Sequence, residues 1–175
     1  MSISALLQAY SREGRLFKVD PFYRGTYSRG FYVTEPINQL LEGNFPEYMT
    51  RGAALLADIS SIAGGHNVSM CFIPYEAEGA DFGLLNPPAD GVWDFRSRDP
   101  EPAIRLLGGF ANKDLFIALT WRWRANLGDR YSQAWRDAIV ETTTEWRNMF
   151  PAINRITGDQ VSDFFEYNAN DKDKE

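Results

Sequence analysis

The sequence predicts an α+β fold in which a small antiparallel sheet carries helices packed on one face. Two observations predict this class. Residues 92–121 alternate in polarity and are interrupted by short turns, which favours antiparallel strands because a parallel return needs a longer crossover. Residues 134–150 place apolar side chains on one face over about four helical turns, and Pro151 ends the pattern. We expect a single α+β domain over residues 1–167 and a disordered polar tail over residues 168–175.

The first third of the chain predicts two helices and one short strand. Helical spacing of apolar residues indicates a helix over residues 4–10, and weak alternation indicates a strand over residues 15–19. Residues 22–33 combine aromatic side chains with glycines and arginines, so we expect a loop or an irregular hairpin there. The next helix covers residues 35–41, because Pro36 suits a first helical turn and Gly43 a stop.

The middle of the chain predicts another helix, a buried strand and a long loop. Residues 46–63 carry leucine and isoleucine on one face, and Gly64-Gly65 stops this helix. Residues 68–73 form a continuous apolar run that is short enough for a buried strand. Residues 74–90 are rich in proline and glycine, and a loop of this length in a compact domain is often functional or mobile.

The expected sheet has three strands, at residues 92–98, 104–107 and 115–121. Gly108-Gly109 indicates a bulge or bend after the second strand. Because side chains alternate along a strand, Arg96 and Arg98 share one face of the first strand. Trp93 and Phe95 share the other face. The first strand therefore has an arginine face and an aromatic face.

Further arginines belong to the same sheet. Arg105 lies on the returning strand, and Arg122 and Arg124 end the third strand. Guanidinium groups suit bidentate contacts with phosphate, so several of them on one sheet can hold an RNA backbone and stabilise charge on a phosphate in flight. The alternative is an exposed face whose arginines pair with neighbouring carboxylates, namely Asp94, Asp99, Glu101 and Asp114.

Composition and charge narrow the classes of function. The net charge of −6 at pH 7 argues against non-specific coating of DNA. No apolar run approaches the roughly 20 residues that span a bilayer. The N-terminus lacks a basic region and an apolar core, so we expect a cytoplasmic protein without a membrane partner. Cys71 and His66 are the only residues of their types, so we expect no internal disulfide, no metal and no cofactor.

Three further features favour ordinary structural roles. His66 follows Gly64-Gly65, so a surface or capping role is favoured over a Ser–His–Asp triad. Cys71 precedes two apolar residues and is interpreted as a small buried side chain rather than a reactive thiol. The long helix also carries acidic side chains away from its apolar face, which is typical of a solvated stripe: Asp137, Glu141 and Glu145.

Three segments of the expected sheet, Gly91–Arg98, Ile104–Ala111 and Asp114–Thr120, resemble the core of RelE/HigB-type toxins of type II toxin–antitoxin systems. In that family an arginine-bearing strand pair is followed by an apolar strand and a helix, and two helices precede the sheet. Residues 35–43 and 46–63 stand in the corresponding place. The resemblance implies a RelE-like fold and a ribosome-dependent mRNA endoribonuclease.

The resemblance also implies roles for the sheet arginines. Arg96 and Arg105 match the family's sheet arginines and would be catalytic, while Arg98, Arg122 and Arg124 would bind substrate. The implied partners are a cognate antitoxin and the ribosome or its mRNA. The chain departs from the family in being acidic and longer. It also lacks the Lys-Lys pair that commonly follows the third strand, where Arg122 and Arg124 stand instead.

A second hypothesis is a non-enzymatic phage or mobile-element protein that binds and inhibits a host protein. Residues 35–90 are strongly acidic, and residues 22–32 carry aromatic side chains that an exposed loop would present to a partner. The partner would then be an unidentified host protein, and no RNA cleavage would be expected.

Overall fold

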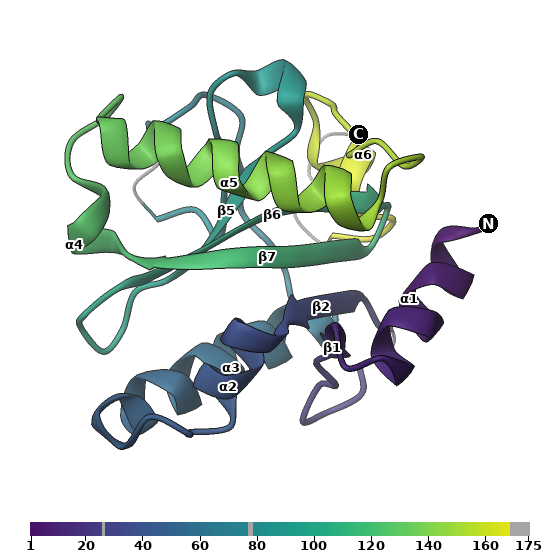
Figure 1. Ribbon diagram of the computed structural model, residues 1–175, viewed down its shortest axis with the longest axis horizontal. Helices are drawn as coiled ribbons and strands as arrows, with labels where there is room; N and C mark the ends of the chain where they lie inside the picture. Colours follow the sequence, from purple (N-terminus) through teal and green to yellow (C-terminus); the bar gives the residue numbers. More distant parts are fainter. Residues whose placement is uncertain (26, 77–78, 169–175) are drawn as a thin grey trace.

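The computed structural model describes residues 1–25, 27–76 and 79–168, and it places them around one seven-stranded sheet (Figure 1). The strand order across the sheet is β1-β2-β7-β6-β5-β4-β3. The strands are β1 (Leu16–Lys18), β2 (Gly30–Thr34), β3 (Met70–Cys71), β4 (Phe82–Leu84), β5 (Trp93–Ser97), β6 (Ile104–Asn112) and β7 (Leu115–Trp123).

The sheet is mixed rather than purely antiparallel. β5, β6 and β7 pair antiparallel in the predicted order, whereas β2 runs parallel to β7 and β3 runs parallel to β4. The prediction of a small antiparallel sheet is therefore wrong in size and in strand direction, although helices and strands combine in one fold as expected. β2 lacks the alternation of polar and apolar residues that indicates a strand, because both of its faces are covered. Phe31 and Val33 are buried on one side and Tyr32 packs on the other.

Helices cover both faces of this sheet. They are α1 (Ile3–Arg12), α2 (Glu35–Leu41), α3 (Met49–Ala63), α4 (Arg124–Leu127), α5 (Gln133–Met149) and α6 (Val161–Phe164), with 3-10 turns at Pro46–Tyr48 and Pro88–Asp90. α2 and α3 lie under one face and α5 lies over the other (Figure 1). The expectation of helices on one face only is wrong because both faces are apolar, with Phe95 towards α3 and Ile117 and Leu107 towards α5. A sheet with two apolar faces needs a layer on each.

The α3 side of the sheet holds an aromatic core. The ring of Phe82 packs against Phe95, Phe110 and Phe116, with centroid distances of 5.2, 5.3 and 5.0 Å. Leu55 of α3 closes this cluster and is fully buried. Burying one such side chain stabilises the fold by roughly 1.5–3 kcal/mol, so these rings supply much of the packing that holds the sheet to α3.

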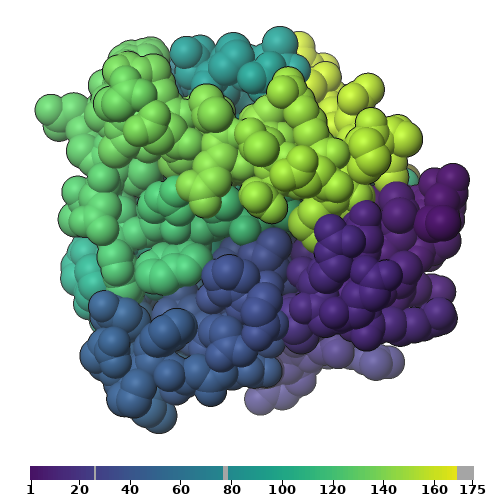
Figure 2. Space-filling view, in the orientation of Figure 1, coloured from purple at the N-terminus to yellow at the C-terminus, as the bar shows by residue number. Residues whose placement is uncertain are grey.

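The other side of the sheet packs against α5 and α1. Trp146 of α5 and Leu7 of α1 belong to one buried cluster with Ile117. The Tyr10 hydroxyl also donates to the Met149 carbonyl, which joins the ends of the two helices. Figure 2 shows this face, where the N-terminal segment in purple lies beside the end of the α5 region in yellow-green.

β6 and β7 approach each other closely at Gly108, where the sequence indicates a bulge. The register shifts between Leu107 and Gly108, and a Cβ at Gly108 would collide with the carbonyl oxygen of Ile117. Only glycine fits there. The bulge separates the apolar part of the strand pair from the part that carries Arg105 and Arg122.

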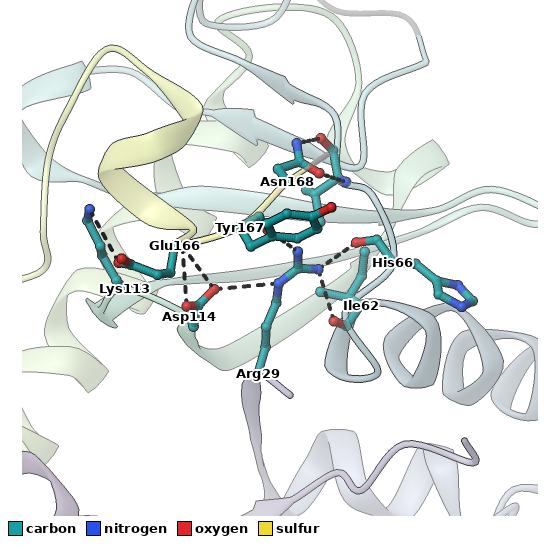
Figure 3. A network of polar contacts seen from close by, with 9 residues as sticks. Arg29, Ile62, His66, Lys113, Asp114, Glu166, Tyr167 and Asn168 are labelled. Atoms are coloured by element: carbon teal, nitrogen blue, oxygen red, sulfur yellow. Dashed lines mark hydrogen bonds and ion pairs between the residues drawn. The ribbon is translucent and has the colours of Figure 1, made fainter. Parts of the chain in front are cut away.

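Arg29 ties the loop before β2 to the C-terminal segment (Figure 3). Its guanidinium donates to three backbone carbonyls, those of Ile62 at 3.2 Å, His66 at 2.6 Å and Tyr167 at 2.9 Å. Its Nε also lies 3.5 Å from a carboxylate oxygen of Asp114, a distance that makes an ion pair rather than a hydrogen bond. Arg29 thus holds three distant segments together.

The residues after α6 continue into the folded domain. Phe164 and Phe165 are buried in the aromatic core. The side chain of Asn168 accepts a hydrogen bond from the Val68 amide at 2.9 Å and donates one to the Val68 carbonyl at 2.8 Å. Asn168, the first residue of the predicted tail, is thus ordered, and residues 169–175 lie outside the described residues.

Candidate functional site

A polar cavity of about 610 Å³ opens on the α5 side of the sheet. We call it the arginine cavity, because five arginines and only two carboxylates line it. Its lining residues are Tyr75, Gly79, Leu85, Asp94, Arg96, Arg98, Arg105, Arg124, Asp129, Arg130 and Trp135. The wall is therefore positive in a chain whose net charge is −6. A positive, concave site in an acidic protein attracts anions locally without making the whole surface basic.

Strand pairing brings the arginines together. Arg96 of β5 lies directly opposite Arg105 of β6, and Arg105 lies opposite Arg122 of β7. Asp94 is two residues before Arg96, so the two share a face, while the intervening Phe95 enters the core. The predicted division of the first strand into an arginine face and an aromatic face agrees with this arrangement.

Asp94 is the anchor of the cluster. Its carboxylate is 1% exposed, and one of its oxygens lies 3.1 Å from Nε of Arg96 and 3.1 Å from Nε of Arg105. One buried negative charge thus holds two guanidinium groups. Since desolvating charges is costly, such a cluster needs compensation, and here a single carboxylate leaves one positive charge in excess.

Arg105 is the most perturbed member of the cluster. Its pKa is lowered to about 10, chiefly by burial and against the opposing effect of Asp94. The neighbouring cations Arg96, Arg124 and Arg98 contribute to this lowering. Arg105 remains protonated at neutral pH, and a bound anion would relieve the repulsion among these groups.

The remaining candidate arginines differ in position. Arg98 reaches the Ala80 carbonyl at the rim of the cavity. Arg124 donates to the Gly128 carbonyl at 2.9 Å and lies over the ring of Trp135, 6.0 Å from its centroid. Four of the five predicted site arginines therefore converge on one cavity.

Arg122 is the exception. It shares the register position beside Arg105 but pairs with Glu141 of α5 and donates to the Trp121 carbonyl at 2.8 Å, outside the arginine cavity. Glu141 had been assigned to a solvated stripe, so this pairing also gives it a structural partner. α5 therefore converts one of the expected ligand-binding arginines into a contact between helix and sheet.

Several site residues were not predicted from the sequence, among them Asp129, Arg130 and Gly83. Arg130 lines the cavity from the loop before α5, and no strand pattern could have placed it there. Gly83 of β4 lies behind Arg96, where a Cβ would collide with the Arg96 guanidinium and approach the Asp94 carboxylate. The absence of a side chain at Gly83 therefore makes room for the cluster.

The other candidate groups have local partners. The Ser61 hydroxyl and Nδ1 of His66 are 2.6 Å apart at the end of α3, in keeping with the capping position expected for His66. Cys71 is half-buried, and its thiol lies 3.3 Å from the Ile73 carbonyl. Within residues 1–25, 27–76 and 79–168, no group of three or more His, Cys, Asp or Glu side chains is placed to hold a metal ion.

Comparison with known proteins gives no relative: no family model, no curated protein and no solved structure matches the chain. The resemblance to RelE/HigB-type toxins therefore stays a prediction. Among the described residues, no helix is both long and apolar enough to cross a membrane. The interpretation of the site accordingly rests on its own geometry.

Proposed function

We propose that the arginine cavity binds the phosphate backbone of single-stranded RNA, and that the chain is an RNA-cleaving protein of the toxin type. One observation carries the proposal: Arg96, Arg98, Arg105 and Arg124 converge on one cavity with a single buried counter-charge. Arginine suits phosphate because its planar fork makes two parallel hydrogen bonds to phosphate oxygens.

The shape of the site favours a single strand over a duplex. A recess of about 610 Å³ can take a splayed nucleotide, whereas the backbone of a double helix would stay outside it. Aromatic side chains stand beside the arginines, since Tyr75 and Trp135 are part of the same wall. Arginines next to aromatic rings are typical of proteins that bind single-stranded nucleic acid.

The cavity contains groups for metal-free cleavage. The 2′-oxygen of one nucleotide attacks the adjacent phosphorus, and its proton passes to Asp129, because Asp94 is already held by two guanidinium groups. The bond from phosphorus to the 5′-oxygen breaks, and the leaving oxygen takes a proton from Arg105, whose pKa of about 10 makes it a stronger acid than an ordinary arginine. Solvent then returns a proton to Arg105 and takes the proton from Asp129. Arg96 stabilises the added charge on the transition state.

The test is cleavage of a labelled single-stranded RNA, with and without ribosomes, together with growth arrest on induced expression. Arg105→Gln is expected to slow cleavage by about 100-fold or more, because removing one preorganised donor costs that much in comparable sites. Arg122→Gln is the matched control: it lies opposite Arg105 in the sheet but outside the cavity, and it should cut at the wild-type rate. Cleavage that survives Arg105→Gln, or falls equally in both variants, would contradict the proposal.

A second candidate function is binding of a host protein through exposed aromatic side chains. Phe22 is 61% exposed, Tyr23 is 86% exposed and Tyr27 is 45% exposed, all in the loop before β2. Exposed large rings of this kind are enriched at protein interfaces. A pull-down that returns one stoichiometric protein with the wild type but not with a Phe22→Ser, Tyr23→Ser variant, together with no cleavage of RNA, would favour this function.

A further inference from the structure

A second cavity adjoins the arginine cavity, and Tyr75 lines both. We call it the side cavity. Its volume is about 530 Å³, and it lies between the loop after β4 and the outer edge of α5. The lining residues of the side cavity are Tyr75, Asn86, Pro87, Asp90, Tyr131, Arg136, Ile139, Val140, Thr143, Thr144 and Arg147. A ligand that fills one cavity can therefore extend past a single tyrosine into the other.

The two cavities differ in chemistry. The side cavity has an apolar floor that includes Ile139 and Val140, and the latter is 64% exposed although it lies on a packed helix. Polar groups surround this floor. They include the side chains of Asn86, Thr143 and Thr144. The side cavity thus suits a flat group with hydrogen-bonding edges, and the arginine cavity suits its phosphate.

The wall between the cavities consists of aromatic rings that pack edge to face. The ring of Tyr75 meets Tyr131 at a centroid distance of 4.8 Å and Trp135 at 5.5 Å. Tyr131 is nevertheless 57% exposed, so part of its ring surface is open to a further ring. The edge-on packing within the wall fixes the direction of the exposed ring faces.

The backbone of this wall is unusual. Tyr75 has φ of 66° and Tyr131 has φ of 63°, a left-handed conformation that bulky side chains rarely adopt. Both tyrosines lie in loops, yet they meet each other and Tyr75 separates the two cavities. Strained residues persist where the surroundings demand them, and they cluster at ligand-binding sites.

We infer that the two cavities form one site for a nucleotide unit, with the phosphate among the arginines and the base on the tyrosine wall over the side cavity. The inference rests on the proposed function and makes it more specific, because a site that reads only phosphates would not use the side cavity. The polar side chains of Asn86 and Thr144 line the side cavity and can bond to the edge of a base.

The test compares two single-stranded 2′-O-methyl RNA probes of equal length and charge, one intact and one with abasic residues. Without a 2′-hydroxyl neither probe can be cleaved, so fluorescence anisotropy reports binding alone. The wild type is expected to bind the intact probe about tenfold more tightly, the effect of stacking one base on an aromatic residue.

Two substitutions at exposed positions of α5 locate the base. Val140→Gln fills the side cavity and should bring the affinity for the intact probe down to that for the abasic probe. Glu145→Gln, at an exposed position that lines neither cavity, should keep the difference, so it controls for any change in α5. Arg105→Gln should weaken both probes.

The outcomes separate the two proposals. If the wild type binds the intact and abasic probes equally, or if Val140→Gln keeps the difference, the base site is overturned while the phosphate site stands. If the wild type binds neither probe, the proposed function is overturned, and the nucleotide site with it.

Discussion

Arg29 is buried and Arg105 is partly buried, and each lies beside an aspartate, yet their surroundings differ. Arg29 donates to three backbone carbonyls and lies over the ring of Phe165, 4.7 Å from its centroid, as Figure 3 shows for its polar contacts. Arg105 shares one carboxylate with Arg96 and borders a cavity. The backbone oxygens around Arg29 are fixed in number and place, so that site is complete without a ligand.

The difference shows how to tell a structural arginine from a binding one. Burial lowers the pKa of both Arg29 and Arg105, so neither burial nor the direction of the shift separates them. The neighbouring charges do. Arg29 donates to three backbone carbonyls and faces one aspartate, whereas Arg105 shares its aspartate with Arg96 and has Arg96, Arg98 and Arg124 as neighbouring cations. A group of cations beside an open cavity attracts an anion.

The largest effect that can test this comparison is expected at Arg29. Arg29→Met should lower the free energy of unfolding by about 3–5 kcal/mol, because three carbonyls and the Asp114 carboxylate lose their donor. Urea denaturation would measure this. Arg24→Met, at an exposed position in the same loop, should change stability by less than about 0.5 kcal/mol. Equal stability of the two variants would remove the structural role of Arg29.

Substitution of Arg105 should change ligand affinity strongly and stability only slightly. Arg105→Gln is expected to weaken binding of the intact 2′-O-methyl RNA probe by about 10- to 100-fold, the value of one charge-assisted hydrogen bond. Stability should fall by no more than about 1.5 kcal/mol, because Asp94 keeps Arg96 as a partner. Denaturation and anisotropy measured on one preparation would reveal both changes. A large loss of stability with unchanged affinity would make Arg105 a second structural arginine.

The pH dependence of binding follows from the pKa of Arg105. Affinity for the same probe should hold at neutral pH and fall as pH rises through about 10, because the folded protein then loses the Arg105 charge. The contribution of Arg105 to the free energy of unfolding should instead increase as pH rises through about 10. The pKa of Arg105 is lower in the folded state than the ordinary value of an arginine, so above about pH 10 the unfolded chain holds more protons and unfolding becomes less favourable. Arg105→Gln should remove this step in affinity, and a step that remains in the variant would assign it to another group.

The smallest effect is expected at Gly83, where geometry changes and charge does not. Gly83→Ala places a Cβ against the Arg96 guanidinium, which must move. We expect a loss of affinity of about threefold to tenfold, equivalent to ~1 kcal/mol, without a change in the number of charges. Gly79→Ala is the comparison, because a Cβ there meets nothing within 4 Å, although its φ of +91° adds local strain. Equal affinities for wild type and Gly83→Ala would show that the position of Arg96 is not critical.

The sequence predicted the parts of the fold that depend on local pattern. β5, β6, β7 and α5 follow from polarity alternation, turns and helical spacing, and so does the separation of Arg96 from Phe95. β2 was missed because its partner β7 lies far along the chain and its two faces are both covered. β4 was missed because it is short and lies in a stretch rich in glycine and proline.

The site residues could be predicted where strand pairing alone places them. Strand register alone brings Arg96 beside Arg105, so these two follow from the pattern. The strand register also places Arg122 opposite Arg105, but Glu141 of α5 pairs with Arg122. Arg130 enters from a loop, and Asp94 becomes an anchor only when the sheet is covered on both faces. Packing between layers, which no strand pattern encodes, decides which arginines stay available.

The docking of residues 160–168 has a consequence for synthesis. Phe164 and Phe165 complete a core whose other rings come from β2, β4, β5, β6 and β7, and Asn168 bonds to Val68, 100 positions earlier in the chain. While the polypeptide grows, every surface that this segment covers is made before the segment itself. The aromatic side of the sheet therefore stays open to solvent until the last of these residues leaves the exit tunnel, and it can aggregate during that time.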